Sequence, residues 1–379
     1  MNHIALVMPD LETGGAERVM LLLARGFAER GHRVDLVVGN AEGPLHDTVP
    51  ASVRLIDLGV RTKPGGAAAF AARFVGRLAG YLRRERPDAV LSTVQGANFA
   101  AVMARALSGV HPRLVLREAA SPAATTSPFR RSLRRLLYPR ADALVALTAP
   151  MREQLIALGV VPVDGTVVIH NPVDVAGIRA AASAPCPHPW FTDSSGPVLV
   201  SVGRLTREKD YPTLLRALAR LRETIPARLL IVGEGAERAA LEALIGYLGL
   251  SAAADLVGFD RNPWRWLARG DVFVLSSTSE GYPNVLREAR ALAVPVVATE
   301  YDASARDLVP DAAAVVRCGD TLALAAALAA RLRGGRPKGS VPRPQEDPDA
   351  LLFRPVDAYL AVLIDGEAVT SRQWSTAEL

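Results

Sequence analysis

Cysteine, aromatic side chains and long apolar runs are all scarce in this sequence of 379 residues. Only Cys186 and Cys318 occur, which excludes a disulfide framework and is typical of a reducing cytosol. No stretch reaches the ~18 to 20 unbroken apolar residues that a membrane span needs. The N-terminal apolar run is too short for a signal peptide and lacks a basic leader. We therefore expect a cytoplasmic globular protein.

Lysine is also nearly absent, with three lysines against 41 arginines. The net charge of +5 is unevenly divided, because residues 1–175 carry 21 basic and 15 acidic side chains whereas the remainder carries 23 and 24. We expect any anionic partner beyond the reaction itself to meet the first half. Nucleic acid is not an expected partner, since no interleaved aromatic stripe or known binding motif accompanies the charge.

Short apolar runs alternate with helical stretches in both halves of the chain. Runs that are apolar throughout favour parallel strands covered on both faces, and the strand–helix–strand order predicts an α/β protein with two Rossmann-like, doubly wound domains. The predicted strands are IALVM, RVDLVV, VRLIDL, AVLS, RLVLRE, ALVAL and TVVIH, and then VLVSVGRL, ARLLIVGEG, ADLVGF, DVFVLSS and VPVVAT.

Composition places the boundaries between these domains. The first domain is predicted over residues 1–175, and a Pro-, Ser- and Ala-rich linker over 176–195. The second domain is predicted over 196–350. A helical tail over 351–379, with its helix starting at about Pro355, is expected to cross back to the first domain. Ligands of such sheets bind beyond the carboxyl ends of the strands, so two facing domains predict a cleft there.

Two loops that follow predicted strands offer groups for phosphate. Arg204 and Lys209 lie in VSVGRLTREKDYPTL, and a planar guanidinium with a compact ammonium suits two phosphates. A solvated turn accounts for the same pattern. Gly15 lies in LETGGAERV at the start of a helix, where backbone N–H groups attract anions, although a plain tight turn fits equally well. The stretch IVGEGAER carries the same ambiguity.

Two glutamates flank a strand-to-helix corner in SEGYPNVLREA. Gly281 and Pro283 keep Glu280 outside the helix that Asn284 begins, while Glu288 lies about one turn inside it. Both carboxylates can then face one ligand, and each can accept hydrogen bonds from the paired hydroxyls of a sugar or ribose. For a single glutamate, an ordinary surface helix would be the better interpretation.

Together, six motifs resemble the retaining, nucleotide-sugar-dependent glycosyltransferases of family four, which have the GT-B fold. These motifs are GGAERV, NPVD, GRLTREKD, LLIVGEGAER, VGF and SEGYPNVLREA, and they span roughly residues 4 to 320 in the order of the family. Glu280 and Glu288 match the E-x7-E motif of that family. The resemblance implies a sugar transfer from a nucleotide donor, with UDP favoured and GDP-mannose left open.

The resemblance also implies roles for individual residues. Arg204 and Lys209 would neutralise the departing diphosphate, Glu280 would hold the donor hexose, and Glu288 the ribose. Gly15 would present its backbone to the donor phosphate, and the backbone at Gly258 and Phe259 would meet the base. The remaining donor-binding positions lie in the loop and first helical turn, at Gly281, Tyr282, Asn284 and Val285.

Three departures from the family pattern bear on the site. Pro283 has no N–H to offer a ligand. Arg117 and Glu118 stand where many relatives carry a histidine, so no histidine role is carried over. The stretch TEYDASARD lacks the glycine pair and glutamate that are frequent there. No cofactor or metal is expected, because the only D-x-D triplet, residues 347–349, lies in a Pro-rich stretch interpreted as a loop.

The segment TSPFRRSLRRLL predicts an amphipathic helix capped by Ser127, with Pro128 at its first position. At 100° per residue, one face carries Arg130, Arg131, Arg134 and Arg135, and the opposite face carries Phe129, Leu133, Leu136 and Leu137. A half-buried surface helix explains this pattern. The alternative is a platform for anionic lipid or a lipid-linked pyrophosphate acceptor, which implies peripheral attachment to the membrane.

The expected function is transfer of a hexose or N-acetylhexosamine to a glycan or lipid-linked acceptor during synthesis of cell-surface polysaccharide. A sugar-nucleotide epimerase remains an alternative; it would need acid–base groups in the first domain, where only Glu118 and Glu17 stand out. A non-catalytic protein that binds sugar nucleotides is a third possibility. It would tolerate the loss of the site residues, and all of them are present.

Overall fold

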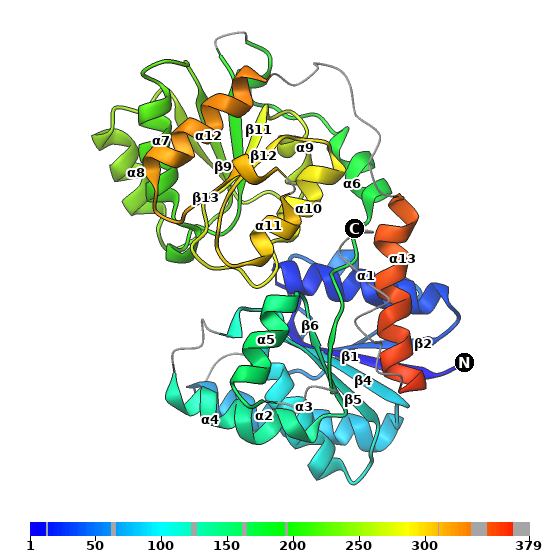
Figure 1. Ribbon diagram of the computed structural model, residues 1–379. Coiled ribbons are helices and arrows are strands. Elements are labelled where there is room, and N and C mark those ends of the chain that lie inside the picture. Colours follow the sequence, from blue (N-terminus) through cyan, green and yellow to red (C-terminus); the bar gives the residue numbers. More distant parts are fainter. Residues whose placement is uncertain are drawn as a thin grey trace. The chain divides into compact units, whose positions relative to one another are not determined.

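The computed structural model describes residues 1–12, 14–61, 66–122, 127–160, 165–193, 196–309, 311–334 and 347–366. The chain divides into two compact units (Figure 1). Unit 1 comprises Met1–Pro172 together with the segment from Ala350 onward, and unit 2 comprises Val173–Asp349. Each unit is a parallel sheet with helices on both faces, so the predicted pair of Rossmann-like domains is confirmed.

The sheet of unit 1 has seven parallel strands in the order β3-β2-β1-β4-β5-β6-β7. The strand order reverses between β1 and β4, which form the centre of the sheet. Each predicted apolar run of the first half forms one of these strands. Their bounds are β1 His3–Asp10, β2 Arg33–Asn40, β3 Arg54–Asp57, β4 Ala89–Thr93, β5 Arg113–Arg117, β6 Ala143–Ala146 and β7 Thr166–Val168.

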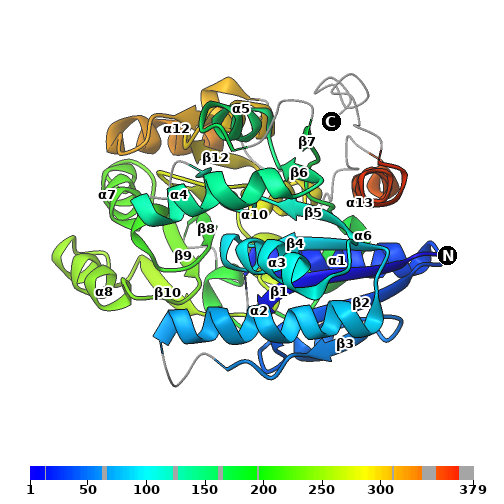
Figure 2. The same ribbon diagram turned by 90° about the horizontal axis from the view of Figure 1, so that it is seen from below.

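Helices cover both faces of this sheet. On one face, α1 (Gly15–Glu29) packs together with α13 (Pro348–Leu360), and Val356 meets Gly26 so closely that a Cβ there would lie 2.7 Å from a Val356 methyl carbon. On the other face lie α2 (Gly66–Glu85) and α3 (Gln95–Ser108), which pack against each other (Figure 2). The connections to the last strands contain α4 (Pro128–Leu137), η3 (Tyr138–Arg140) and α5 (Ala149–Ala157).

The sheet of unit 2 has six parallel strands in the order β10-β9-β8-β11-β12-β13. Here the order reverses between β8 and β11, and ligands of open α/β sheets bind beyond the carboxyl ends of the strands at such a switch point. The strands are β8 Val198–Val202, β9 Arg228–Val232, β10 Ala254–Gly258, β11 Val272–Leu275, β12 Val296–Thr299 and β13 Val315–Val316. Only β13, two residues long, was not predicted.

The helices of unit 2 also form two layers. One face of the sheet carries α7 (Tyr211–Leu221), α8 (Arg238–Tyr247) and α12 (Thr321–Arg333), whose leucines fill the core with the strand side chains. The other face carries α6 (Val175–Ala182), α9 (Trp264–Leu267) and α10 (Asn284–Ala291), which contact one another. The short α11 (Ser304–Leu308) follows β12.

Three boundaries differ from the sequence prediction. The expected linker, 176–195, contains most of α6 and the short η5 (Pro189–Phe191), and Trp190 stacks beneath Arg228 of β9, so its described part belongs to unit 2. The last helix begins at Pro348 instead of near Pro355, which lies inside it. The D-x-D triplet, interpreted as a loop, is helical in part: Asp347 precedes α13 and accepts a hydrogen bond from the N–H of Asp349 in its first turn. The expected tail beyond residue 366 lies outside the described residues.

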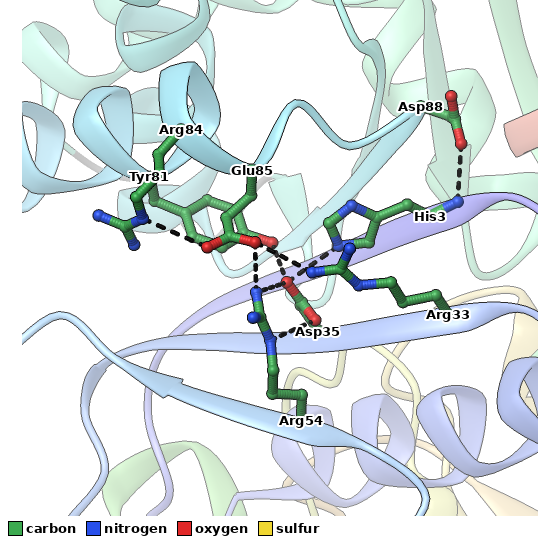
Figure 3. Close-up of polar contacts among 8 residues, drawn as sticks. All are labelled: His3, Arg33, Asp35, Arg54, Tyr81, Arg84, Glu85 and Asp88. Carbon is green, nitrogen blue, oxygen red and sulfur yellow. Dashed lines mark hydrogen bonds and ion pairs between the residues drawn. The ribbon is translucent and has the colours of Figure 1, made fainter.

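A buried carboxylate cross-links side chains near the amino ends of strands in the unit 1 sheet (Figure 3). Asp35 of β2 accepts hydrogen bonds from His3 Nε2 at 2.9 Å, Tyr81 Oη at 2.7 Å and Arg54 Nη2 at 2.6 Å. Burial opposes ionisation, but these hydrogen bonds outweigh it and lower the pKa of Asp35. Arg54 also bonds to Glu85 at 2.7 Å. Because this cluster lies at the strand ends opposite those where ligands bind, we assign it to stability.

Candidate active site

The carboxyl ends of β8 and β11 bring together two of the predicted site residues. Lys209 Nζ lies 2.6 Å from Glu280 Oε1, and the two side chains are only 15% and 12% exposed. Ser277 Oγ donates a second hydrogen bond to the same oxygen, at 2.6 Å. A carboxylate can accept further hydrogen bonds and an ammonium can donate further ones. Both groups of this ion pair can therefore still form hydrogen bonds to a ligand.

Backbone contacts fix the two loops that carry this pair. Ser276 Oγ donates to the carbonyl of Lys209 at 2.7 Å, and the N–H of Thr278 donates to the carbonyl of Glu208 at 2.8 Å. Asp210 then turns the chain into α7 with a positive φ of 44°, and its side chain caps that helix at Thr213. Lys209 is therefore held at the switch point by the backbone on both sides of it.

The second glutamate lies on α10, as predicted. This helix begins at Asn284, which confirms that Glu280 lies outside the helix and Glu288 inside it. Glu288 and Asn284 are half-buried, as are Gly281 and Val285. Tyr282 is buried, and its hydroxyl accepts a hydrogen bond from Arg287 Nη1 at 3.0 Å.

Arg204 does not join the ion pair in this structure. Its side chain is 77% exposed, and its nearest acidic partner is Glu208 at 3.8 Å. An exposed arginine at the end of β8 remains free to rotate, because a surface contact of this length holds it only weakly. Of the two predicted cations, only Lys209 therefore contacts Glu280 in this structure.

The predicted phosphate loop of unit 2 has a packing role. A Cβ on Gly233 would lie 1.9 Å from the carbonyl oxygen of Gly203, and one on Gly235 would lie 2.4 Å from that of Leu205. Only glycine allows these two loops to pack so closely. The N–H of Gly233 also bonds to the carbonyl of Gly258, whose φ is +90°, and Phe259 beyond it is exposed.

In unit 1, Gly15 is the exposed first residue of α1. Ser127 caps α4 as predicted, since its Oγ accepts a bond from the N–H of Arg130 at 3.4 Å. Arg130, Arg131 and Arg135 are exposed. The predicted helical faces are wrong in part, because Phe129 and Leu136 are exposed as well and Arg134 is buried.

Arg134 is buried because a carboxylate lies beneath α4. Arg134 Nη2 is 3.7 Å from Glu118 Oε2, which also accepts a hydrogen bond from Tyr138 Oη at 2.9 Å. Burial raises the pKa of Glu118, and Arg134 and Tyr138 partly oppose that shift. Glu118 is itself buried, and its contacts with Arg134 and Tyr138 fix α4 to the end of β5.

Arg117, next to Glu118, is buried too. Its guanidinium donates to Thr93 Oγ1 at 2.8 Å and to Asn171 Oδ1 at 2.6 Å. These bonds tie the carboxyl ends of β4 and β5 to Asn171, close to the point where the chain passes from unit 1 to unit 2, so this arginine has a structural role.

Across the described ranges, no group of three or more His, Cys, Asp or Glu side chains is arranged to hold a metal ion. Among the described helices, none combines the length and the apolar character that crossing a bilayer demands. Sequence reasoning missed Ser277, which contacts Glu280 directly; its place three residues before the glutamate, on the same loop, was the available signal.

Comparisons with known proteins bear on the family and the fold of the chain. The family described as "Glycosyl transferase 4-like domain" matches residues 14–172, and "Glycosyl transferases group 1" matches residues 196–333. A structure of Anabaena HepE with UDP and glucose shares the fold, with a TM-score of 0.72 and 18% identity over 98% of both chains.

Two curated relatives come from Campylobacter jejuni. N-acetylgalactosamine-N,N'-diacetylbacillosaminyl-diphospho-undecaprenol 4-alpha-N-acetylgalactosaminyltransferase is 33% identical over 56% of this chain and 58% of its own length. An alpha-1,4-N-acetyl-D-galactosaminyltransferase named for a diNAcBac-PP-undecaprenol-linked glycan is 26% identical over 86% and 87%. The chain thus spans less than two thirds of the first of these relatives.

Both units carry a glycosyltransferase domain match, and the solved neighbours share the two-domain architecture. The chain has the GT-B fold and belongs to the GT-B glycosyltransferase superfamily.

Proposed function

We propose that this protein is a retaining, metal-independent glycosyltransferase that moves a hexose or N-acetylhexosamine from a UDP-sugar to a glycan or lipid-linked acceptor. The observation that carries this proposal is the Lys209–Glu280 pair at the switch point of unit 2. An ammonium group and a carboxylate occur together where an open α/β sheet receives its ligand.

Each group then has a chemical task. Lys209 stabilises the negative charge that grows on the diphosphate as the bond to the anomeric carbon breaks, and Arg204 swings in to share it. Glu280 accepts hydrogen bonds from the hexose, and Glu288 from the ribose. Gly15, Gly258 and Phe259 provide backbone contacts to phosphate and base, while Gly281, Tyr282, Asn284 and Val285 line the donor loop.

The proposed sugar transfer needs no reagent other than the donor and the acceptor. The acceptor hydroxyl oxygen attacks the anomeric carbon on the face that the diphosphate leaves, the carbon–oxygen bond to phosphate breaks, and the hydroxyl proton passes to a phosphate oxygen. UDP is released with that proton. No protein carboxylate has to serve as base in this scheme, which suits a site whose Glu280 is engaged by Lys209 and Ser277.

The relatives support the choice of donor and acceptor. The two Campylobacter proteins are named as N-acetylgalactosaminyltransferases acting on undecaprenol-linked diphosphates, and HepE was solved with UDP and glucose. We extend to this chain a UDP-sugar donor and a lipid-linked acceptor, met at the cytoplasmic face of the membrane.

The α4 surface, defined as Phe129, Arg131, Arg135 and Leu136, is the proposed membrane contact. Phe129 is 73% and Leu136 55% exposed, and Arg131 and Arg135 of the same helix are exposed as well. A surface helix that exposes both apolar side chains and arginines suits the boundary between lipid headgroups and acyl chains.

The direct test is transfer from a panel of UDP- and GDP-sugars to an undecaprenyl-diphosphate-linked saccharide, with and without EDTA, followed by NMR of the new linkage. The proposal requires transfer from at least one UDP-sugar, unchanged by EDTA, with the anomeric configuration of the donor retained. Inversion, a requirement for metal, or interconversion of the sugar on the nucleotide would each contradict it.

A further inference from the structure

The loop after β12 lies beside the proposed donor site. Thr299, the last residue of β12, donates its hydroxyl to the carbonyl of Ser277 at 2.5 Å. Cys318 also points its Sγ at the carbonyls of Ser277 and Glu300, at 3.5 and 3.4 Å. The loop that follows Thr299 is thereby fastened to the loop that carries Glu280.

Tyr301 is the second residue of this loop, and its side chain is turned inward. The residue is only 8% exposed, and among the described residues its hydroxyl has no hydrogen-bond partner. Burying a hydroxyl without a partner is unfavourable, so such groups are uncommon in native structures and call for an explanation.

Polar and charged side chains surround the Tyr301 hydroxyl. Burial raises the pKa of Tyr301, the nearby side chain of Ser304 opposes that rise, and the negative charges of Asp302 and Glu280 add to it. The hydroxyl therefore stays protonated and keeps both a donor and acceptor sites within electrostatic reach of Glu280. Asp302 is already engaged, since its Oδ1 accepts bonds from the N–H and the hydroxyl of Ser304.

We propose that the Tyr301 hydroxyl binds the sugar ring of the donor, next to Glu280, and helps to select which hexose is transferred. This inference rests on the proposed function. A buried hydroxyl with unused hydrogen-bonding capacity, on a loop tied to the glutamate loop, fits a polar substituent of the hexose. It also identifies a contact in TEYDASARD, the stretch where the chain departs from the pattern of its relatives.

A second buried tyrosine provides a matched control. Tyr211 is also buried near Glu280, and its hydroxyl also has no hydrogen-bond partner among the described residues. It is packed differently, because a Cβ on Gly203 would lie 3.0 Å from the Tyr211 hydroxyl and 3.1 Å from Lys209 Cε. Tyr211 thus lies under the backbone and the lysine stem, and we assign it no contact with the sugar.

The experiment is calorimetric titration of UDP and of UDP-GalNAc, UDP-GlcNAc, UDP-galactose and UDP-glucose into wild type, Tyr301→Phe and Tyr211→Phe. For the UDP-sugar that wild type binds best, Tyr301→Phe should weaken binding about 5- to 30-fold, the effect of losing one hydrogen bond to a buried polar group. The affinity for UDP should stay within about twofold, and Tyr211→Phe should change neither affinity.

Donor analogues that each lack one hydroxyl or the acetamido group add a second readout. Removing the substituent that Tyr301 contacts should weaken binding to wild type. It should not weaken binding to Tyr301→Phe, because that variant already lacks the hydroxyl partner. Equal sugar affinity in Tyr301→Phe and wild type, an equal loss for UDP alone, or an equal effect of Tyr211→Phe would overturn the inference while leaving the proposed function intact. If wild type neither binds any nucleotide sugar nor transfers sugar from one, the proposed function and the inference about Tyr301 are both wrong.

Discussion

Lys209 and Glu280 form a half-buried ion pair 2.6 Å long, although they lie in segments that follow different strands and are 71 residues apart in the chain. The two strands that carry their loops, β8 and β11, are neighbours only because the sheet order reverses between them. The topology of unit 2, more than any local motif, thus creates the site.

Replacing Lys209 by alanine tests its electrostatic role. Steady-state transfer should fall by about 10²- to 10³-fold, as when one preorganised group that stabilises developing charge is removed. The matched control is Arg207→Ala, two residues away with an almost fully exposed side chain, and it should retain near-normal turnover. Near-normal turnover of Lys209→Ala, with an unchanged melting temperature, would show that the site is assigned wrongly.

Replacing Glu288 by alanine tests the nucleotide end of the site. We expect transfer to fall by orders of magnitude and UDP affinity to weaken, because the ribose hydroxyls would lose their acceptor. Glu223→Ala, an exposed glutamate of the same unit, serves as the comparison. If calorimetry gives Glu288→Ala the UDP affinity of wild type, Glu288 has no ribose contact.

The α4 surface predicts selective binding to anionic membranes. Arg131→Glu with Arg135→Glu should abolish sedimentation with vesicles containing phosphatidylglycerol, and Phe129→Ser with Leu136→Ser should weaken it. Arg73→Glu with Arg83→Glu makes the same charge change on exposed positions of α2 and should have little effect. Equal binding of wild type to neutral and anionic vesicles, or none to either, would eliminate the surface as a membrane contact.

Asp35 predicts a dependence of stability on acid. Its pKa is lowered in the folded state, so its contribution is complete above the unfolded value of about 3.9 and is lost as the pH falls through the folded value. Asp35→Asn should lower the free energy of unfolding by about 1–3 kcal/mol at neutral pH, because three donors lose a charged acceptor. It should also reduce the loss of stability that acid causes. Denaturant unfolding between pH 3 and 7 measures both, with exposed Asp47→Asn as control. If Asp35→Asn loses as much stability at low pH as wild type does, the assignment is contradicted.

Periodicity was sufficient to predict most of the framework. Twelve apolar runs form the twelve longer strands, because strands buried on both faces must be apolar throughout. The start of α10 was also predictable, since Pro283 and Asn284 are local signals. The two-residue β13 carries too little pattern to be recognised.

Features that depend on distant partners were not predictable. A helical wheel places Arg134 with the other arginines of α4, but it cannot show that Glu118, from the end of β5, lies beneath it. The same holds for Tyr301, because its loop is tied to the distant loop that carries Glu280. Ser277 was missed although it lies only three residues before Glu280. The start of α13 was missed because Pro355 looked like a first helical residue, whereas that helix begins seven residues earlier.

The place of α13 has a consequence for how the chain folds during synthesis. The core of unit 1 includes Val356, Tyr359, Val362 and Leu363, and Asp357 pairs with Arg30 of α1. The ribosome makes these residues after all of unit 2. The second unit is therefore free to complete its fold first, while the first waits with an uncovered apolar face until its closing helix emerges.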